Sequence, residues 1–84
     1  MEDADQIAAD MMAMIQAWYP VFLEETKLSD SAFVRIEFYT KMIQIVKDDV
    51  GFVGRDKVIA QLQIHQHRAM AELRHIIKNR LQKN

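Results

Sequence analysis

The feature that most constrains this chain is its near lack of residues that break helices. Its 84 residues include two glycines and one proline, while half of the residues are hydrophobic. Such a composition is typical of an almost wholly helical protein. We therefore expect an all-α fold with three helices in a bundle or hairpin, in which the C-terminal helix is the longest and further copies complete the assembly.

The chain is short enough that residues 1–84 are expected to form a single helical domain. A domain of this size buries only roughly 60–65% of the surface that its unfolded chain exposes. It has no cysteine, so neither disulfides nor thiolate zinc sites can stabilise it. Natural chains of this size often gain stability from a partner copy instead.

Three amphipathic stretches are separated by two breaks, LSDSAF and GFVGRD. They predict helices over residues 4–26, 31–50 and 55–81. Pro20 should kink or restart the first helix, because its ring would clash with the carbonyl of Gln16. The positions of the third helix predicted to face the core are Val58, Ile59, Leu62, Ala69, Met70, Leu73, Ile76 and Ile77.

The apolar faces of these helices are wider than three short helices can cover. Apolar side chains, ending at Val50, occupy roughly 200° of the second helix. Ile64 lies on the side of the third helix opposite its core face. In the first helix, Trp18 and Tyr19 form either part of the core or a docking site for a partner. Because these apolar faces are wider than one chain can cover, they favour self-association into a homo-oligomer. The residues predicted for its interface, or for that with another protein, are Met12, Tyr19, Phe38, Met42, Ala60, Ile64 and Ala71.

Charge is distributed unevenly along the chain. Residues 1–26 contain six acidic and no basic residues, whereas residues 27–84 contain eleven basic and six acidic ones. Basic side chains along a helix can bind phosphates, although cations near a helix C-terminus also complement its dipole. The alternative function is therefore binding of an anionic ligand, either nucleic acid or a nucleotide. The residues predicted to bind it are Arg35, Tyr39, Arg68, Arg74, His75 and Lys78.

Two polar residues fall within apolar faces. Arg35 needs a partner there, and the acidic first helix is expected to supply a carboxylate. Gln66 lies in the core face of the third helix, where it either fixes the pairing of helices or marks the end of the core.

The three histidines lie in the segment IHQHRAMAELRHIIKNR, separated by two, eight and ten residues. Two ligands on one helix need a spacing of three or four residues to reach one metal ion, so we predict no metal site. No nucleophile accompanies the histidines, and no phosphate-binding loop is present. We therefore predict that the protein is not an enzyme and has no cofactor.

The first ten residues, MEDADQIAAD, lack the layout of a signal peptide. No run approaches the roughly 18 apolar residues that span a bilayer. We expect a soluble cytoplasmic protein that does not enter the membrane. The favoured function is non-catalytic binding by a small homo-oligomer, acting on a larger protein as an adaptor, chaperone or inhibitor.

Overall fold

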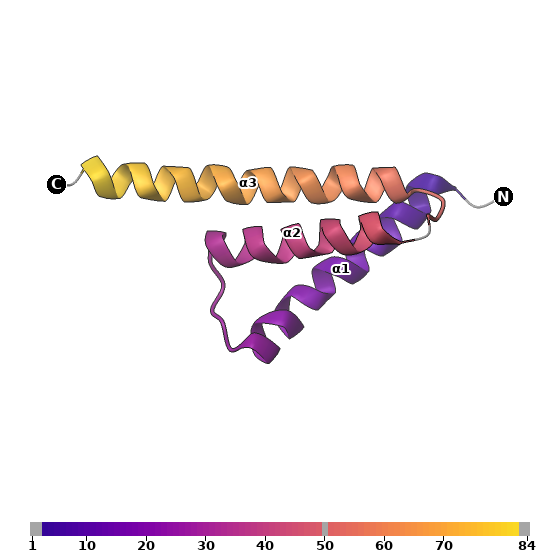
Figure 1. Ribbon diagram of the computed structural model, residues 1–84, viewed down its shortest axis with the longest axis horizontal. Helices are drawn as coiled ribbons and strands as arrows, with labels where there is room; N and C mark the ends of the chain where they lie inside the picture. Colours follow the sequence, from indigo (N-terminus) through magenta and orange to yellow (C-terminus); the bar gives the residue numbers. More distant parts are fainter. Residues whose placement is uncertain (1–2, 50, 83–84) are drawn as a thin grey trace.

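Three α-helices make up this computed structural model, which describes residues 3–49 and 51–82 and contains no strand within them (Figure 1). The helices are α1 (Ala4–Thr26), α2 (Ala32–Asp48) and α3 (Arg55–Gln82). The all-α class predicted from composition is confirmed. The helix bounds lie close to the expected ranges, and Val50, expected to end the second helix, lies outside the described residues.

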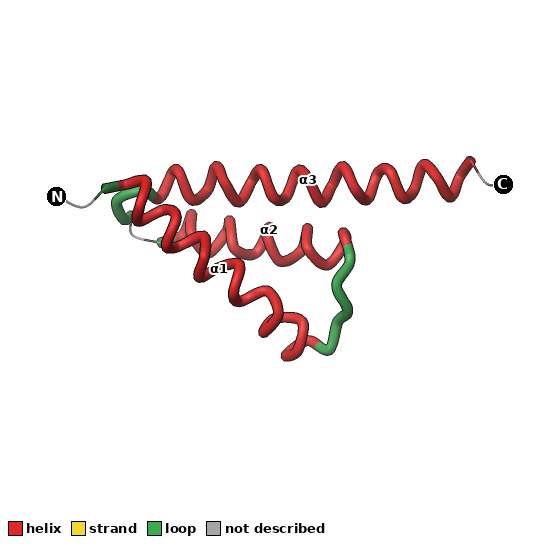
Figure 2. The backbone as a smooth tube through the Cα atoms, turned by 180° about the vertical axis from the view of Figure 1, so that it is seen from behind, coloured by secondary structure: helices red, strands yellow, loops and turns green. Residues whose placement is uncertain are grey.

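The arrangement is a hairpin crossed by one further helix. α2 and α3 run antiparallel and make most of the interhelical contacts (Figures 1 and 2). α1 begins against the start of α3 and then diverges from the hairpin. The molecule measures 58 × 25 × 20 Å, and it is elongated because α3 continues well past the start of α2 (Figure 1).

The ends of the helices follow from local side chains. Asp3 caps α1 by accepting a hydrogen bond from the backbone nitrogen of Asp5 at 3.0 Å. Ser31 caps α2 in the same way, accepting from the nitrogen of Val34 at 3.2 Å. Lys27 ends α1 with a left-handed backbone, φ 59°. Each cap satisfies a backbone group that the terminal turn of a helix leaves without an intrahelical partner.

α1 approaches the start of α3 very closely at Gly54. The backbone there has φ +88°, and a Cβ atom would lie 2.7 Å from the carbonyl oxygen of Ala4. Glycine alone accommodates both the left-handed backbone and the close approach. The fully buried Ala8 keeps the helices close one turn later, and an ion pair between Lys57 and Asp5 links the same two helices.

Of the two outcomes expected at Pro20, a kink or a restart of the helix, the restart does not occur. The helix continues to Thr26, so no new helix begins at the proline. An internal proline removes one backbone hydrogen bond and strains the preceding turn. Packing offsets this loss, because the ring of Phe22 lies 5.3 Å from that of Phe38 and ties the last turns of α1 to α2.

The core is apolar and centres on Phe38, whose side chain is 1% exposed. The rings of Tyr19, Phe22 and Tyr39 surround it at centroid distances of 5.1–5.4 Å. Tilted aromatic pairs at such distances stabilise a core beyond the area they bury. Other core residues are Ala8, Met12, Ile15, Ile43, Val46, Val58 and Leu62.

The apolar stripe predicted for α3 is buried over only part of its length. Val58, Leu62 and Ala69 are buried as expected. The prediction that the rest of the stripe faces the core is wrong for three residues, which are exposed: Met70, Ile76 and Ile77.

The antiparallel register of α2 on α3 explains the exposure of Ile76 and Ile77. Gln66 donates a hydrogen bond to the hydroxyl of Thr40 at 2.8 Å, and Arg35 pairs with Glu72 at 2.8 Å. With these partners aligned, Ala32 at the start of α2 lies opposite the turn that follows Glu72. The remaining residues of α3 have no part of α2 beside them.

Candidate functional site

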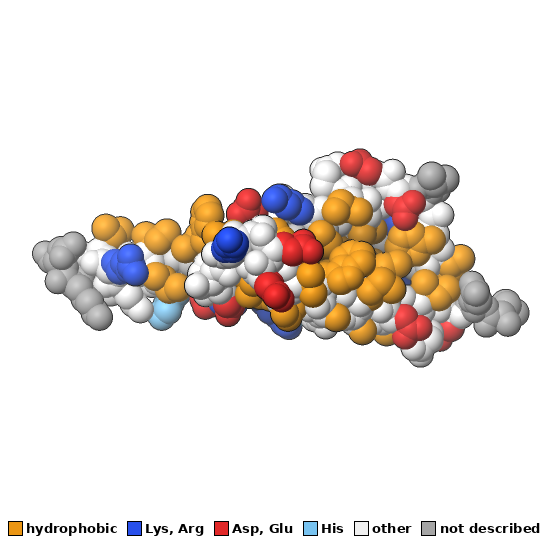
Figure 3. Space-filling model, turned by 90° about the horizontal axis from the view of Figure 1, so that it is seen from below, with side chains coloured by type: hydrophobic (Ala, Val, Ile, Leu, Met, Phe, Trp, Pro, Cys, Tyr) orange, Lys and Arg blue, Asp and Glu red, His pale blue; other side chains and the backbone are white. Residues whose placement is uncertain are grey.

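An apolar groove lies between α1 and α2, and no residue of α3 lines it. It consists of two hollows of about 250 and 290 Å³ that share Trp18 and Met42. Figure 3 shows hydrophobic side chains gathered on this side of the molecule. We call this surface the α1–α2 groove, and its apolar lining also includes Met11, Met14, Val21, Phe22, Ile45 and Phe52.

The groove exists because α1 diverges from α2 after its close contact with α3. Met14, Trp18 and Val21 follow one face of α1 at spacings of four and three residues, and their exposed fractions are 47–49%. Ile45 of α2 is 58% exposed. A contiguous exposed apolar surface with a polar rim is typical of an interaction site.

Carboxylates lie at both ends of the groove. Glu25 lines one hollow and Asp49 lines the other, and α1 contains no basic residue between Ala4 and Thr26. Figure 3 shows Asp and Glu side chains around the apolar surface. One cation also lies at its edge, with the Lys41 amine 5.6 Å from the centre of the Phe22 ring. The rim as a whole favours a partner with basic side chains.

A polar network joins the three helices where the hairpin opens. Tyr19 of α1 donates to Asp30 at 2.5 Å, and Arg35 of α2 donates to the same carboxylate at 3.0 Å. Arg35 also donates to both oxygens of Glu72 on α3, at 2.8 and 3.2 Å. We call these four residues the clasp. The bidentate contact with Glu72 fixes the angle between guanidinium and carboxylate as well as their distance.

The clasp shifts the ionisation of its own members. Burial raises the pKa of the Tyr19 hydroxyl to about 12, and its hydrogen bond to Asp30 acts in the same direction. The same hydrogen bond lowers the pKa of the Asp30 carboxyl, because it stabilises the charged form. The hydrogen bond to Glu72 raises the pKa of Arg35. At neutral pH Tyr19 is therefore a neutral donor, Asp30 an anion and Arg35 a cation.

These contacts occupy Arg35, the first residue predicted to bind an anion. Its Nε, Nη1 and Nη2 atoms all donate to carboxylates. Tyr39, predicted to act with it, stacks on His65 with ring centroids 5.2 Å apart. The expectation that the first helix supplies the carboxylates is wrong, because Asp30 lies in the α1–α2 loop and Glu72 on α3.

The other residues predicted to bind an anion are exposed on α3. Arg68, Arg74 and Lys78 form no ion pair within residues 3–49 and 51–82, and the ring of His75 lies 3.2 Å from the side-chain nitrogen of Asn79. These cations are spread along one helix and line none of the hollows described above. Within the described chain, no three His, Asp or Glu side chains are placed to hold a metal ion.

The residues predicted to form an interface are divided among several environments. Met12 and Phe38 are buried in the chain's own core, where Phe38 also lines the floor of one hollow of the groove. Met42 lines the groove, and Tyr19 belongs to the clasp. The others are exposed on α3: Ala60, Ile64 and Ala71.

Several groove residues were not singled out from the sequence. Trp18 was considered as a docking spot, but Val21, Ile45 and Phe52 were not. Ile45 belongs to the wide apolar arc of the second helix, and that arc is the signal that could have identified it. The sequence alone does not show which part of this arc remains uncovered when α1 packs against α2.

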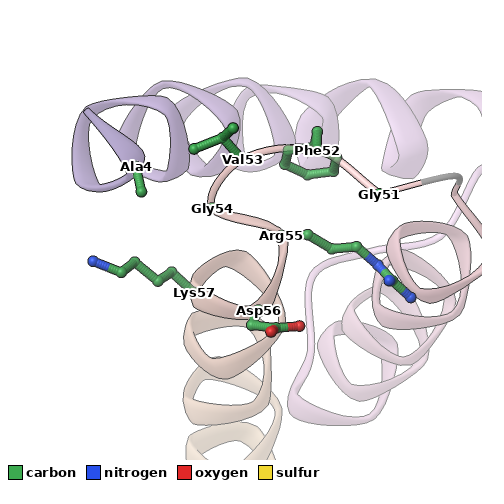
Figure 4. A pocket seen from close by; sticks show the side chains of 8 residues that line it. All are labelled: Ala4, Gly51, Phe52, Val53, Gly54, Arg55, Asp56 and Lys57. Carbon is green, nitrogen blue, oxygen red and sulfur yellow. The ribbon is translucent and has the colours of Figure 1, made fainter. Parts of the chain in front are cut away.

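A second depression lies at the loop between α2 and α3, lined by residues 51–57 and the start of α1 (Figure 4). Its charged side chains point in different directions. Arg55 donates to two backbone carbonyls at the C-terminal end of α2, and Lys57 pairs with Asp5. These groups hold the loop against the helices and do not converge on a ligand.

The chain has no significant match among protein-family models, curated proteins or solved structures. A search of the described helices finds none with a stretch long and apolar enough to cross a bilayer. The α1–α2 groove is therefore the feature from which a function can be inferred.

Proposed function

We propose that this protein is a non-catalytic, homo-oligomeric helical binding protein whose α1–α2 groove docks an amphipathic helix. The observation that carries the proposal is the exposed row of Met14, Trp18 and Val21 facing Ile45 within a rim of carboxylates. Grooves of this kind take the apolar face of a helix, with contacts repeating every three to four residues. A protein with such a groove could act as an adaptor, chaperone or inhibitor of a larger protein.

The lining and the rim define the chemistry of the bound helix. Its apolar side chains would lie against Trp18, and basic side chains beside them would meet Glu25 and Asp49. Acidic helices would be disfavoured, because like charges across an interface are repelled. Met11, Met14 and Met42 are flexible, so the groove can adapt to apolar side chains of different shape.

Trp18 is the only tryptophan of the chain, so its fluorescence reports directly on the groove. We expect a helical peptide rich in leucine and lysine to shift the emission to shorter wavelength, with a Kd of about 1–100 µM. A peptide in which glutamate replaces every lysine should leave the emission unchanged.

Two variants test whether the groove is the binding surface. Ile45→Asp should weaken binding of the basic peptide at least about tenfold, because it introduces a charge into the apolar lining. The matched control is Val53→Asp, at a residue of similar exposure, 56% against 58%, that lines neither hollow of the groove. The control should bind as the wild type does. Equal loss in both variants, or no binding by the wild type, contradicts the proposal.

The second candidate function is binding of nucleic acid or a nucleotide. It is favoured by Arg68, Arg74 and Lys78, which are exposed and form no ion pair with other described residues. Binding should then weaken steeply with salt, and Arg74→Ala combined with Lys78→Ala should reduce the salt dependence. Absence of binding to RNA, DNA and nucleotides at low salt would exclude this candidate.

A further inference from the structure

The end of α3 projects beyond the rest of the bundle as an amphipathic helix. Residues 73–82, which we call the α3 tail, follow the last contact of α3 with the clasp (Figure 1). Leu73, Ile76 and Ile77 share one face of the helix, and Ile77 is 49% exposed. Short helices gain most of their stability from covering such a face. The tail therefore lacks the neighbour that its pattern requires.

The tail has the chemistry that the α1–α2 groove selects. It carries Arg74, Lys78 and Arg80 and no acidic residue, whereas Glu25 and Asp49 lie at the ends of the groove. Figure 3 shows basic and hydrophobic side chains on the projecting end and carboxylates around the groove. The lengths also agree, since the tail and the groove wall from Met11 to Val21 each span about 15 Å of helix.

The tail cannot occupy the groove of its own chain. α3 is one unbroken helix from Arg55 to Gln82, so its end points away from α1 and α2 (Figure 2). We infer that the groove takes the tail of a second copy of this chain, and that the second copy's groove takes the tail of the first. This inference rests on the proposed function, because it uses the same groove. Reciprocal exchange of this kind forms a closed dimer with two-fold symmetry.

The distribution of charge favours this dimer over two other symmetric dimers, in which tail packs on tail or groove on groove. Two tails packed together would place Arg74, Lys78 and Arg80 of one copy near those of the other, and two grooves packed together would oppose carboxylates. Only the exchange of tail for groove brings opposite charges together at both contacts. In the exchanged dimer, Ile76 and Ile77 of one copy would lie against Trp18 and Ile45 of the other.

The test is the mass of the 84-residue chain in solution, measured by sedimentation at about 100 µM. We expect a dimer for the wild type and for the Val53→Asp control. Ile77→Asp in the tail and Ile45→Asp in the groove should each weaken association at least about tenfold. An equal mixture of these two variants should associate more strongly than either variant alone but more weakly than the wild type, because only one of the two contacts, the intact tail of one variant in the intact groove of the other, is restored. Both substituted side chains are exposed, and circular dichroism is the check that each variant folds.

The outcomes separate this inference from the proposed function. A dimeric wild type whose two variants fail to associate when mixed would overturn the exchange and leave the homo-oligomer standing. A monomeric wild type would overturn both the exchange and the homo-oligomer. Binding of the basic peptide, reported by Trp18, is measured at dilutions that keep the chain monomeric, so the tail of a second copy does not compete for the groove and the result is independent of the dimer test.

Discussion

The two halves of α3 carry the same apolar pattern but have different surroundings. In the first half, Leu62 is fully buried between α1 and α2, whereas Ile77 in the second half is 49% exposed. The difference arises because α2 begins at Ala32 and leaves the end of α3 without a neighbour. Helical periodicity therefore identifies the face that a helix will bury, but not the molecule that covers it.

The largest effect is expected from a matched pair of side-chain truncations, one in each half of α3. Leu62→Ala should lower the free energy of unfolding by about 2–5 kcal/mol, because it leaves a cavity in a closed core. Ile77→Ala should lower it by less than about 0.5 kcal/mol at concentrations that keep the chain monomeric. Urea denaturation measures both. Similar losses for the two variants would show that the tail packs within its own chain.

The packed half also depends on a backbone contact that the projecting half lacks. Gly54→Ala should destabilise the fold by about 1–3 kcal/mol, because the new Cβ would be both strained and too close to the carbonyl of Ala4. Gly51→Ala is the control, with a similar φ of +93° but no atom within 4 Å. It should cost only the backbone strain, about 1 kcal/mol. Thermal unfolding of both variants isolates the contribution of the close approach.

The smallest expected effect concerns the clasp, which lies at the boundary between the two halves. Asp30 has a lowered pKa in the folded protein, chiefly through the hydrogen bond from Tyr19. Its contribution to stability is therefore present above the ordinary carboxyl pKa and is lost as the pH falls below about 4. Tyr19→Phe should raise the pKa of Asp30 and reduce this loss, by under about 1 kcal/mol because the pair is exposed.

An NMR titration of the Asp30 carboxyl, together with unfolding at neutral and acid pH, measures this effect. The wild type supplies the reference in both experiments. An unchanged Asp30 pKa in Tyr19→Phe would show that the hydrogen bond does not hold the carboxylate in its charged form.

The number, type and approximate limits of the helices could be predicted from the sequence because local chemistry determines them. Asp3 and Ser31 are capping residues, and Gly51 and Gly54 mark the turn before α3. The exposed end of α3 could not be predicted in this way. It depends on the pairing of Arg35 with Glu72, residues far apart in sequence, and periodicity carries no information on such pairs.

The groove was predictable only in part, for the same reason. The excess of apolar surface was evident from the width of the helix faces, and Trp18 was recognised as a candidate docking residue. Met12 and Phe38 were also expected at an interface, but they form the core. Assigning each residue to core or groove requires the direction in which α1 crosses α2, and a contact at Gly54, outside both helices, helps to set that direction.

The core contains no buried polar side chain within the described residues. Apolar side chains of similar size substitute for one another at little cost in free energy. A core without polar groups therefore does little to prevent α2 from shifting along α3 by one helical turn. The register is then held by polar contacts at the surface: Gln66 with Thr40, Arg35 with Glu72, and Arg55 with the carbonyls of Val46 and Lys47. A shift of α2 by one turn would change the length of α3 that projects beyond α2 by about 5.4 Å. Polar contacts on the surface thus set how far α3 extends beyond the start of α2.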